Sequence, residues 1–395
     1  MPAELHAEPL PASTPFVAVV AGEASGDLLA GLLLAGLRQR WPEMLAAGIG
    51  GPNMTRQGFS AWWPHHKLAV HGFGWEVLRK YREIVGIRNQ LRSRLLDKKP
   101  DLFIGVDAPD FNLELECKLR EHGVRTVHFV CPSIWAWRAE RVEKIRNSVD
   151  HVLCIFPFEP ALLASHGIDA TYVGHPLASL IPMEPDKLAA RATLGIQPGD
   201  TVLAILPGSR ASEIQYLAET FFETAKRIRK QLPNIKLLVP AVASMRNAIE
   251  NAAKRACMLE HVTIINGQSH TVLAACDVTL IASGTATLEA ALYKRPMVIA
   301  YRMSWLSWQI MRRKQLQPWV GLPNILSQSF IVPELLQEEA TPEALSREVL
   351  QWFNAIALRP EKLAALQQQY VALHKSLQRD TTSLATHAIE KILAH

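Results

Sequence analysis

The carboxylate of Asp107 stands where a buried strand is expected to end, a position suited to acid–base chemistry. Asp107 directly follows the apolar run Asp101–Val106. Ligands of open parallel sheets bind outside the carboxyl ends of the strands, and a carboxylate held there can take a proton from a substrate hydroxyl group. Asp107 is therefore our candidate general base. Helix capping by Asp110 or Asn112 is the alternative for this segment, and the two acids lack a third metal ligand nearby.

The segment Gly22-Glu-Ala-Ser-Gly-Asp27 is a second candidate for ligand binding, because it joins a strand-like run to a helical pattern. Gly22 and Gly26 permit a tight turn and a close approach of the backbone, and the following helix offers its N-terminus to an anion. The segment matches neither G-x-G-x-x-G nor the P-loop, which argues against dinucleotide binding and nucleotide hydrolysis. A plain turn capped by Ser25 or Asp27 is the alternative.

The segment Leu206-Pro-Gly-Ser-Arg210 carries residue types that bind phosphate. Its glycine allows the backbone to approach a ligand, Ser209 can donate a hydrogen bond, and the guanidinium of Arg210 can bind phosphate through two parallel hydrogen bonds. We predict a phosphate contact by Arg210, with an ordinary surface cation as the alternative.

A related site is expected where a strand-like run ends at Ser283. Gly284, Thr285 and Thr287 are small residues at the start of the next helix, whose N–H groups and dipole suit a diphosphate. Glu289 follows one turn later. It is placed either to accept hydrogen bonds from ribose hydroxyl groups or to complete a capping box with the threonine.

Several classes of enzyme are excluded by the absence of their motifs. The chain contains no Gly-x-Ser-x-Gly, His-Glu-x-x-His or EF-hand spacing, so hydrolase and metalloprotease functions have no support. Its five cysteines form no Cys-x-x-Cys pair, which indicates reduced thiols in a cytosolic protein. We predict no bound metal and no cofactor.

These residues are positioned by short runs rich in Val, Ile and Leu, each followed by a turn and a helical pattern. The runs are continuously apolar, as strands buried on both faces of a parallel sheet are. After a proline-bearing stretch at 176–198 the series starts afresh at Thr201. We predict an α/β fold of two Rossmann-like domains facing across a cleft. The expected boundaries are a disordered leader at 1–15, domains at 16–180 and 181–365, and a helix at 366–395 that packs back on the N-terminal domain.

Composition describes a globular protein with an ample core: 49% of the residues are hydrophobic and 20% are charged. It excludes a disordered chain, a disulfide scaffold and a polytopic membrane protein. The net charge of +5 is small, but basic residues concentrate at 75–99 and 290–333. Such asymmetry indicates an anionic partner.

Tryptophans accompany both basic segments. Trp62, Trp63 and Trp75 adjoin the first one, whereas Trp305 and Trp308 precede Arg312 and Arg313 in the second. Tryptophan beside Lys and Arg on an amphipathic segment suits an anionic lipid surface, so we predict peripheral membrane contact by these residues. Core helices with a solvated face are the alternative. A nucleic-acid partner is not expected, because no nucleic-acid-binding motif is present.

Eight ordered motifs resemble those of the lipid-A-disaccharide synthase family, from about residue 16 to the C-terminal region. They are Gly22–Asp27, Val106–Asn112, Pro132–Arg138, Phe156–Glu159, Val173–Leu177, Leu206–Arg210, Gly284–Glu289 and Leu322–Asn324. The resemblance implies a GT-B glycosyltransferase with an acceptor-side first domain and a UDP-sugar-binding second domain. It implies transfer of 2,3-diacylglucosamine from UDP-2,3-diacylglucosamine to the 6-hydroxyl of 2,3-diacylglucosamine 1-phosphate. The products would be the lipid A disaccharide 1-phosphate and UDP.

The resemblance also assigns residues and a location. Asp107 matches the family's candidate catalytic carboxylate, and Glu23 and Ser25 lie in its N-terminal signature, so Glu23 is a second candidate for catalysis. Arg210, Glu289 and Asn324 match the donor-nucleotide side. Members are cytoplasmic proteins bound peripherally to the inner membrane. The sequence leaves open whether the protein forms a homodimer.

Two other functions fit the same residues. One is another GT-B sugar-nucleotide enzyme, acting on a different lipid acceptor or epimerising a UDP-sugar. The other is a noncatalytic membrane adaptor that senses nucleotide, although a phosphate-binding arginine together with a strand-end carboxylate argues against that class.

Overall fold

The computed structural model describes residues 14–68, 75–136 and 139–394. The leader expected at 1–15 therefore lies almost wholly outside the described residues. The described chain forms two compact units. Of the described residues, 14–68, 75–134, 139–176 and 379–394 form the first unit, and 135–136 and 177–378 form the second.

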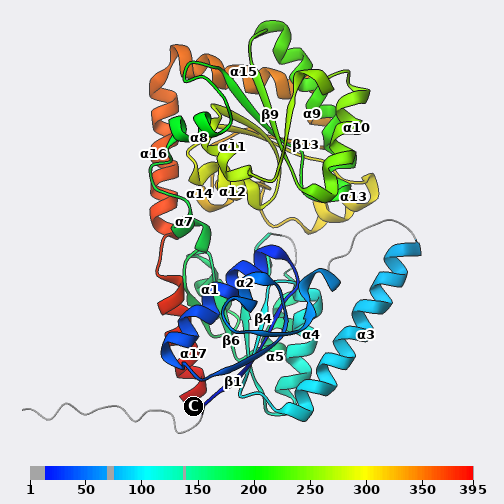
Figure 1. Ribbon diagram of the computed structural model, residues 1–395, viewed down its shortest axis with the longest axis vertical. Coiled ribbons are helices and arrows are strands. Elements are labelled where there is room, and N and C mark those ends of the chain that lie inside the picture. Colours follow the sequence, from blue (N-terminus) through cyan, green and yellow to red (C-terminus); the bar gives the residue numbers. More distant parts are fainter. Residues whose placement is uncertain (1–13, 69–74, 137–138, 395) are drawn as a thin grey trace, which may run out of the picture. The chain divides into compact units, whose positions relative to one another are not determined.

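The first unit is built on a seven-stranded sheet in the order β3-β2-β1-β4-β5-β6-β7, and every described pairing in it is parallel (Figure 1). Its strands are β1 (Phe16–Ala21), β2 (Leu45–Gly50), β3 (Ser60–Pro64), β4 (Leu102–Val106), β5 (Arg125–Phe129), β6 (His151–Cys154) and β7 (Ala170–Tyr172). Its helices are α1 (Ala24–Arg40), α2 (Pro52–Thr55), α3 (Trp75–Lys98), α4 (Pro109–Arg120), α5 (Arg141–Ser148), α6 (Glu159–Ala164) and α17 (Thr381–Ala394).

The core of the first unit follows from its apolar pattern. All five residues of β4 are buried, as expected for a strand covered on both faces. Helices α3 and α4 pack on β1 and β4 through one cluster of buried side chains. Its helical members are Ile87, Leu91, Leu95, Phe111, Leu115 and Leu119.

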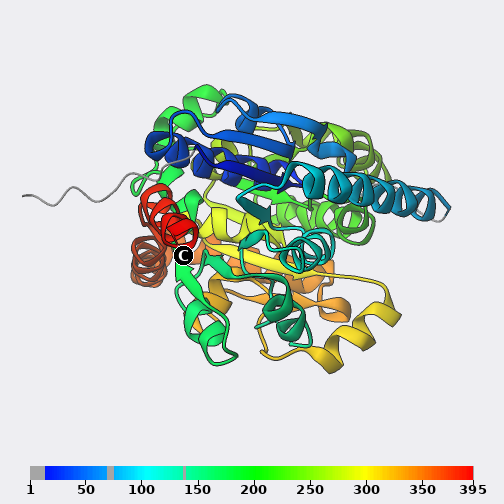
Figure 2. The same cartoon turned by 90° about the horizontal axis from the view of Figure 1, so that it is seen from below.

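Helix α17 belongs to the first unit although it comes from the end of the sequence. It lies beside α1, as Figures 1 and 2 both show. A Cβ atom added to Gly36 would lie 2.3 Å from Thr382 Cγ2, so glycine permits the close approach of these two helices.

The second unit is built on a six-stranded sheet in the order β10-β9-β8-β11-β12-β13, again parallel throughout its described pairings. Its strands are β8 (Val202–Leu206), β9 (Lys236–Ala241), β10 (Thr263–Asn266), β11 (Val278–Ala282), β12 (Met297–Tyr301) and β13 (Glu334–Leu336). Its helices are α7 (Pro176–Leu180), α8 (Lys187–Thr193), α9 (Ala211–Gln231), α10 (Arg246–Arg255), α11 (Ser269–Ala275), α12 (Thr285–Leu292), α13 (Trp305–Lys314), α14 (Leu322–Ser327), α15 (Pro342–Leu358) and α16 (Pro360–Leu377).

Each sheet has one point at which its strand order reverses. In the first sheet this point lies between β1 and β4, and in the second it lies between β8 and β11. Chain connections leave in opposite directions at such a point and open a crevice at the carboxyl ends of the two strands, where ligands bind. The predicted α/β fold is confirmed, and each unit contains one such position.

Candidate active site

The carboxylate predicted to act as a base lies at the reversal point of the first sheet. Asp107 follows the last residue of β4 and is half-buried, and its N–H donates to the Phe129 carbonyl over 2.9 Å. Asp107 and Ala108 both have left-handed backbones, with φ values of +51° and +44°. Non-glycine residues in such conformations cost on the order of 1–3 kcal/mol each and are concentrated at functional sites.

Neither proposed capping residue caps α4. The N-cap is Ala108, Pro109 occupies the first turn, and the side chain of Asp110 is exposed and forms an ion pair with Arg141. Asn112 is completely buried and donates to the carbonyl of Asp107 over 2.8 Å. The capping alternative is thus incorrect for both residues.

Glu23 lies at the other strand of the same reversal point, as the N-cap of α1. Its side chain is exposed and forms no capping hydrogen bond. Glu23 and Asp107 therefore follow β1 and β4, which are adjacent in the sheet. Ser25, also exposed, lies in the first turn of α1, so the alternative of a turn capped by Ser25 or Asp27 is incorrect.

The glycines of this segment serve close packing more than a tight turn. Neither Gly22 nor Gly26 has a positive φ. A Cβ atom on Gly26 would lie 3.5 Å from Ala21 Cβ and 3.6 Å from the Val106 carbonyl oxygen, so α1 starts in contact with both strands. Asp27 is buried, and its carboxylate accepts hydrogen bonds from the backbone N–H groups of residues 51, 53 and 54, which open α2.

The turn after β8 presents Arg210 at the reversal point of the second sheet. The Arg210 side chain is 71% exposed, and its one described ion pair is a long contact of 3.8 Å to Glu213. Glu213 accepts from the backbone N–H groups of Ser209 and Arg210, over 2.8 and 3.2 Å. Gly208 has a φ of +122°, and a Cβ atom there would lie 2.4 Å from Glu213 Cβ. The absence of a side chain at Gly208 therefore leaves room for the Glu213 side chain that caps the helix. The guanidinium group of Arg210 stays accessible to an anion.

The turn after β11 opens α12 at the same reversal point. Gly284 and Thr285 are exposed, and the first N–H groups of a helix have no acceptor within the helix, which makes this end suited to phosphate. Thr287 differs from the prediction of a direct ligand contact. It is completely buried, its hydroxyl donates to the Gly284 carbonyl over 2.7 Å, and it accepts from the Leu322 N–H.

Asn324, matched to the nucleotide side by resemblance, is also completely buried. Its Nδ2 donates to the Val332 carbonyl and to Glu334, and its Oδ1 accepts from the N–H groups of Ile331 and Val332. These bonds use all of its donors and both acceptor lone pairs. In this structure Asn324 holds the segment 321–334 and does not present a polar group to a ligand.

Glu289 has a partner that the sequence pattern did not indicate. Its Oε2 lies 3.5 Å from Nε2 of His270, which is on α11, and the ring of His270 lies 5.7 Å from that of Tyr293. The hydrogen bond with Glu289 raises the pKa of His270. His270 follows Asn266-Gly267-Gln268, a turn after β10, and only this position at a strand's carboxyl end could have indicated it.

The tryptophans predicted to contact lipid have different environments. Trp62 and Trp63, in β3, are partly buried and pack against the core of the first unit, and the Arg94 guanidinium lies 4.0 Å from the Trp62 ring centroid. Lipid contact by these two partly buried rings stays a prediction. The side chain of Trp75 lies outside the described part of the structure.

Helix α13, by contrast, presents an apolar surface. Trp305, Leu306 and Ile310 are 69%, 65% and 54% exposed, and no residue of the helix is buried. Trp308 is half-buried. The helix ends in Arg312, Arg313 and Lys314, of which both arginines are exposed.

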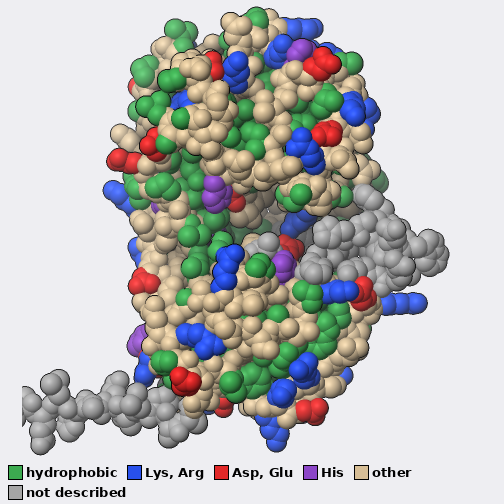
Figure 3. Space-filling model, viewed as in Figure 1, with side chains coloured by type: hydrophobic (Ala, Val, Ile, Leu, Met, Phe, Trp, Pro, Cys, Tyr) green, Lys and Arg blue, Asp and Glu red, His purple; other side chains and the backbone are tan. Residues whose placement is uncertain are grey.

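The basic segment 290–333 is only partly a surface patch. Lys294 and Arg295 are buried, and Arg295 donates to the carbonyls of Leu273 and Ala274 near the end of α11. Arg302 donates to the carbonyl of Gln337. Of the basic residues in this segment, only those at the end of α13 are therefore exposed at the surface. Figure 3 shows Lys and Arg side chains in blue dispersed over the visible face, with hydrophobic side chains between them.

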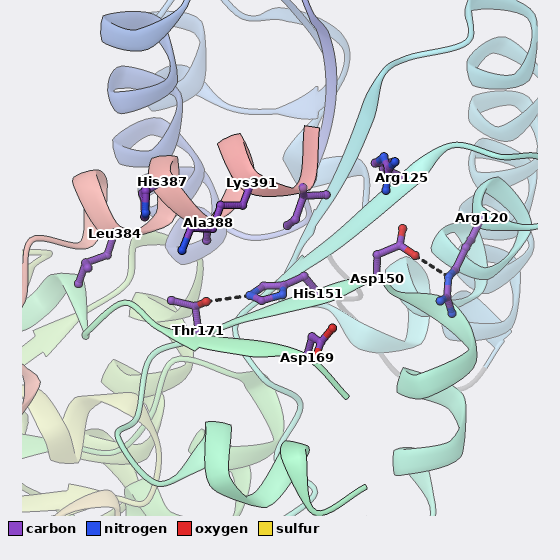
Figure 4. A pocket seen from close by; sticks show the side chains of 11 residues that line it. Arg120, Arg125, Asp150, His151, Asp169, Thr171, Leu384, His387, Ala388 and Lys391 are labelled. Carbon is purple, nitrogen blue, oxygen red and sulfur yellow. Dashed lines mark hydrogen bonds and ion pairs between the residues drawn. The ribbon is translucent and has the colours of Figure 1, made fainter. Parts of the chain in front are cut away.

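A pocket of about 460 Å³ lies elsewhere in the first unit (Figure 4). It is bounded by the amino ends of β5, β6 and β7 and by α17. Two pairs of its side chains bind each other: Arg120 with Asp150, and His151 with Thr171. Because ligands of parallel sheets bind at the carboxyl ends, this pocket is not the candidate active site.

The family model described as lipid-A-disaccharide synthetase matches residues 17–389. The lipid-A-disaccharide synthase of Albidiferax ferrireducens is 71% identical to this chain over 377 residues, which cover 95% of the chain and 97% of that protein. The chain belongs to the lipid-A-disaccharide synthase family. The family's synthase from Verminephrobacter eiseniae is 64% identical, over 96% of this chain and 97% of its own length.

Solved structures of other proteins share the fold of this family member. The UDP-GlcNAc 2-epimerase of Neisseria meningitidis, bound to UDP-GlcNAc, aligns with a TM-score of 0.61 at 12% identity, over 96% of this chain and 99% of the epimerase. A glycosyltransferase of kitacinnamycin aligns with a TM-score of 0.60 at 17% identity, over 96% and 99%. At these identities the likeness shows the GT-B fold alone.

Among the residues that the structure describes, none of the helices combines the length and the apolar character needed to cross a bilayer. The same residues include no group of three His, Cys, Asp or Glu side chains that could hold a metal ion.

Proposed function

We propose that this chain catalyses the reaction of its family, the synthesis of the lipid A disaccharide 1-phosphate. It transfers 2,3-diacylglucosamine from its UDP donor to the 6-hydroxyl of 2,3-diacylglucosamine 1-phosphate and releases UDP. The observation that carries the proposal is the family match, which covers residues 17–389 and spans the reversal points of both sheets.

In the first unit Asp107 takes the proton of the acceptor hydroxyl group. Its carboxylate is half-buried at the end of β4, and its backbone is held in a left-handed conformation. Glu23, exposed at the end of β1, assists it or replaces it as the base. Attack by the activated hydroxyl on the anomeric carbon of the donor inverts its configuration.

In the second unit the diphosphate of UDP is bound by Arg210 and by the N-terminus of α12 at Gly284 and Thr285. Both follow strands at the reversal point of that sheet, and both carry positive charge or its dipolar equivalent. They stabilise the negative charge that develops on UDP as it leaves, a contribution typically worth about 10²- to 10³-fold in rate. Glu289, which pairs with His270, accepts hydrogen bonds from the ribose hydroxyl groups.

Both substrates carry acyl chains, and α13 offers a surface for the membrane that holds them. Its exposed Trp305, Leu306 and Ile310 suit the lipid interface, and Arg312 and Arg313 suit anionic headgroups. We therefore propose peripheral binding of the protein to the cytoplasmic face of the inner membrane.

The deciding experiment compares Asp107→Asn with Asp110→Asn in an assay of purified protein with both diacyl substrates. Loss of the base is expected to lower kcat by about 10²- to 10⁴-fold. Asp110 lies three residues away and is exposed, so its variant is the matched control and keeps the wild-type rate.

Three outcomes would overturn the proposal. Wild-type turnover by Asp107→Asn would remove the base from the mechanism. Conversion of a UDP-sugar supplied alone would indicate an epimerase, and nucleotide binding without UDP release from both substrates would indicate an adaptor.

A further inference from the structure

Three polar side chains lie completely buried behind the turn that carries Asp107. They are Asn112, Glu116 and His128. Asn112 and Glu116 are one turn apart on α4 and thus share a face, and His128 is the β5 residue paired with Gly105 of β4. We call these three residues the buried polar cluster.

Gly105 makes the space that the buried polar cluster occupies. A Cβ atom on Gly105 would lie 2.1 Å from Glu116 Oε1 and 2.8 Å from Asn112 Cβ. Any larger residue at this point of β4 would displace both side chains. The strand therefore contributes no side chain where the helix contributes two polar ones.

Asn112 links the buried polar cluster to Asp107. Its Nδ2 donates to the Asp107 carbonyl over 2.8 Å and to the Val106 carbonyl over 3.4 Å. These carbonyls belong to the two peptide groups on either side of the Asp107 Cα atom. The bonds therefore restrain both backbone dihedrals of a residue whose φ is +51°, and with them the direction of its carboxylate.

The buried polar cluster is not what stability alone favours at a helix–sheet interface. Nδ1 of His128 lies 2.8 Å from Oε1 of Glu116, but Asn112 Oδ1, Glu116 Oε2 and His128 Nε2 have no hydrogen-bond partner within the described part of the chain. Buried polar atoms without partners destabilise a fold, and apolar groups of the same shape are often neutral or stabilising. A role other than stability is therefore needed to explain these side chains.

We propose that Asn112, seated against Glu116, His128 and Gly105, is the positioning residue of Asp107. It holds the carboxylate in the orientation from which the proton of the acceptor hydroxyl is taken, without touching either substrate. The inference rests on the proposed function, because it requires Asp107 to be the base.

The first test is the kinetics of Asn112→Leu, which keeps the approximate volume and removes the donor. A misplaced base slows the chemical step, so kcat is expected to fall by about 10- to 100-fold while KM for both substrates changes less than about twofold. Thr126→Val is the matched control. It removes a buried hydroxyl group of β5 that binds the Ser148 carbonyl, away from the Asp107 turn, and is expected to keep the wild-type kcat.

A double variant distinguishes positioning from a general loss of structure. Residues that act through one group are not additive, so Asn112→Leu is expected to lower kcat no further in an Asp107→Asn background. Additive losses would overturn the inference, as would a wild-type kcat for Asn112→Leu. If Asn112→Leu does not fold by circular dichroism, Asn112→Ser, whose hydroxyl is too short to replace the amide, carries the same expectations.

The two proposals fail in different ways. If Asp107→Asn turns over at the wild-type rate, the proposed function has the wrong base. If kcat falls for Asp107→Asn but not for Asn112→Leu, only the positioning inference is overturned. Gly105→Ala fills the space that Asn112 occupies beside β4 without changing a polar side chain. It is expected to lower kcat with little change in KM.

Discussion

His175 lies in the interior of the first unit, with 6% of its surface exposed and its ring 5.7 Å from the ring of Phe156. Burial disfavours the charged imidazolium and lowers the pKa of His175 to about 4. In the unfolded chain an imidazole has a pKa of about 6.5. The unfolded state therefore binds a proton that the folded state does not as the pH falls from about 6.5 to about 4.

This difference predicts a loss of stability in acid. Between about pH 6.5 and pH 4.5 the protonation of His175 is expected to remove about 2–3 kcal/mol from the free energy of unfolding. His175→Gln has no such group, so its stability should change by that much less over the same interval. Urea unfolding at both pH values measures the difference, with the exposed His166→Gln as a control. If the free energy of unfolding changed equally between the two pH values for His175→Gln and the wild type, the loss of stability could not be assigned to His175.

Other single residues show why charge counted along a sequence is not charge at a surface. Lys294 and Arg295 contribute to the basic segment in the sequence, but the fold buries both of them. Lys294 donates to the Leu292 carbonyl and contacts His374, and burial lowers its pKa to about 8. The carbonyls that Arg295 binds, those of Leu273 and Ala274, are brought into reach only by the tertiary structure. The same applies to Asn324, whose partners lie seven to ten residues away along the chain.

At the scale of elements, strands with a continuous apolar run could be predicted from the sequence, whereas three strands without such a run could not. The apolar runs of the sequence correspond to strands, including β4, β8 and β11, from which the site is built. They are 16–21, 101–106, 126–130, 151–156, 171–173, 201–206, 236–239, 262–265, 278–282 and 297–301. The sequence did not indicate β2, β3 or β13. Strand β2 is rich in Ala and Gly, β3 ends in proline at a sheet edge, and β13 has only three residues. These strands pair because their neighbours are already in place, which local pattern does not report.

Membrane binding is predicted to depend on the exposed apolar residues of helix α13. Replacing Trp305, Leu306 and Ile310 by serine removes the exposed apolar surface and leaves Arg312 and Arg313 in place. Burial of apolar side chains at an interface is worth roughly 1.5–3 kcal/mol each, so binding to vesicles with anionic lipid is expected to weaken at least about 100-fold. Vesicle sedimentation measures this directly.

The control for that experiment is Leu358→Ser at the end of α15. Leu358 is 77% exposed and belongs to α15, not to α13, so vesicle binding should not change. Unchanged binding by the α13 variant would exclude this helix as the membrane contact.

For the whole molecule the decisive question is which groups neutralise the leaving UDP. In the proposed mechanism Arg210 and the N-terminus of α12 do so, without a divalent cation. Turnover of both substrates in excess EDTA is therefore expected to stay within about twofold of the untreated rate. Loss of activity in EDTA that magnesium restores would contradict it. A variant of Arg210 assayed in parallel separates loss of the phosphate contact from loss of a metal.

The placement of α17 in the first unit has a consequence for biosynthesis. During translation about 200 residues of the second unit are made between the rest of the first unit and this helix. At about 5–20 residues per second, roughly 10–40 s pass during which α1 lacks the helix that packs on it. The face around Gly36 then remains uncovered, so the first unit to be synthesised is the last to complete its packing.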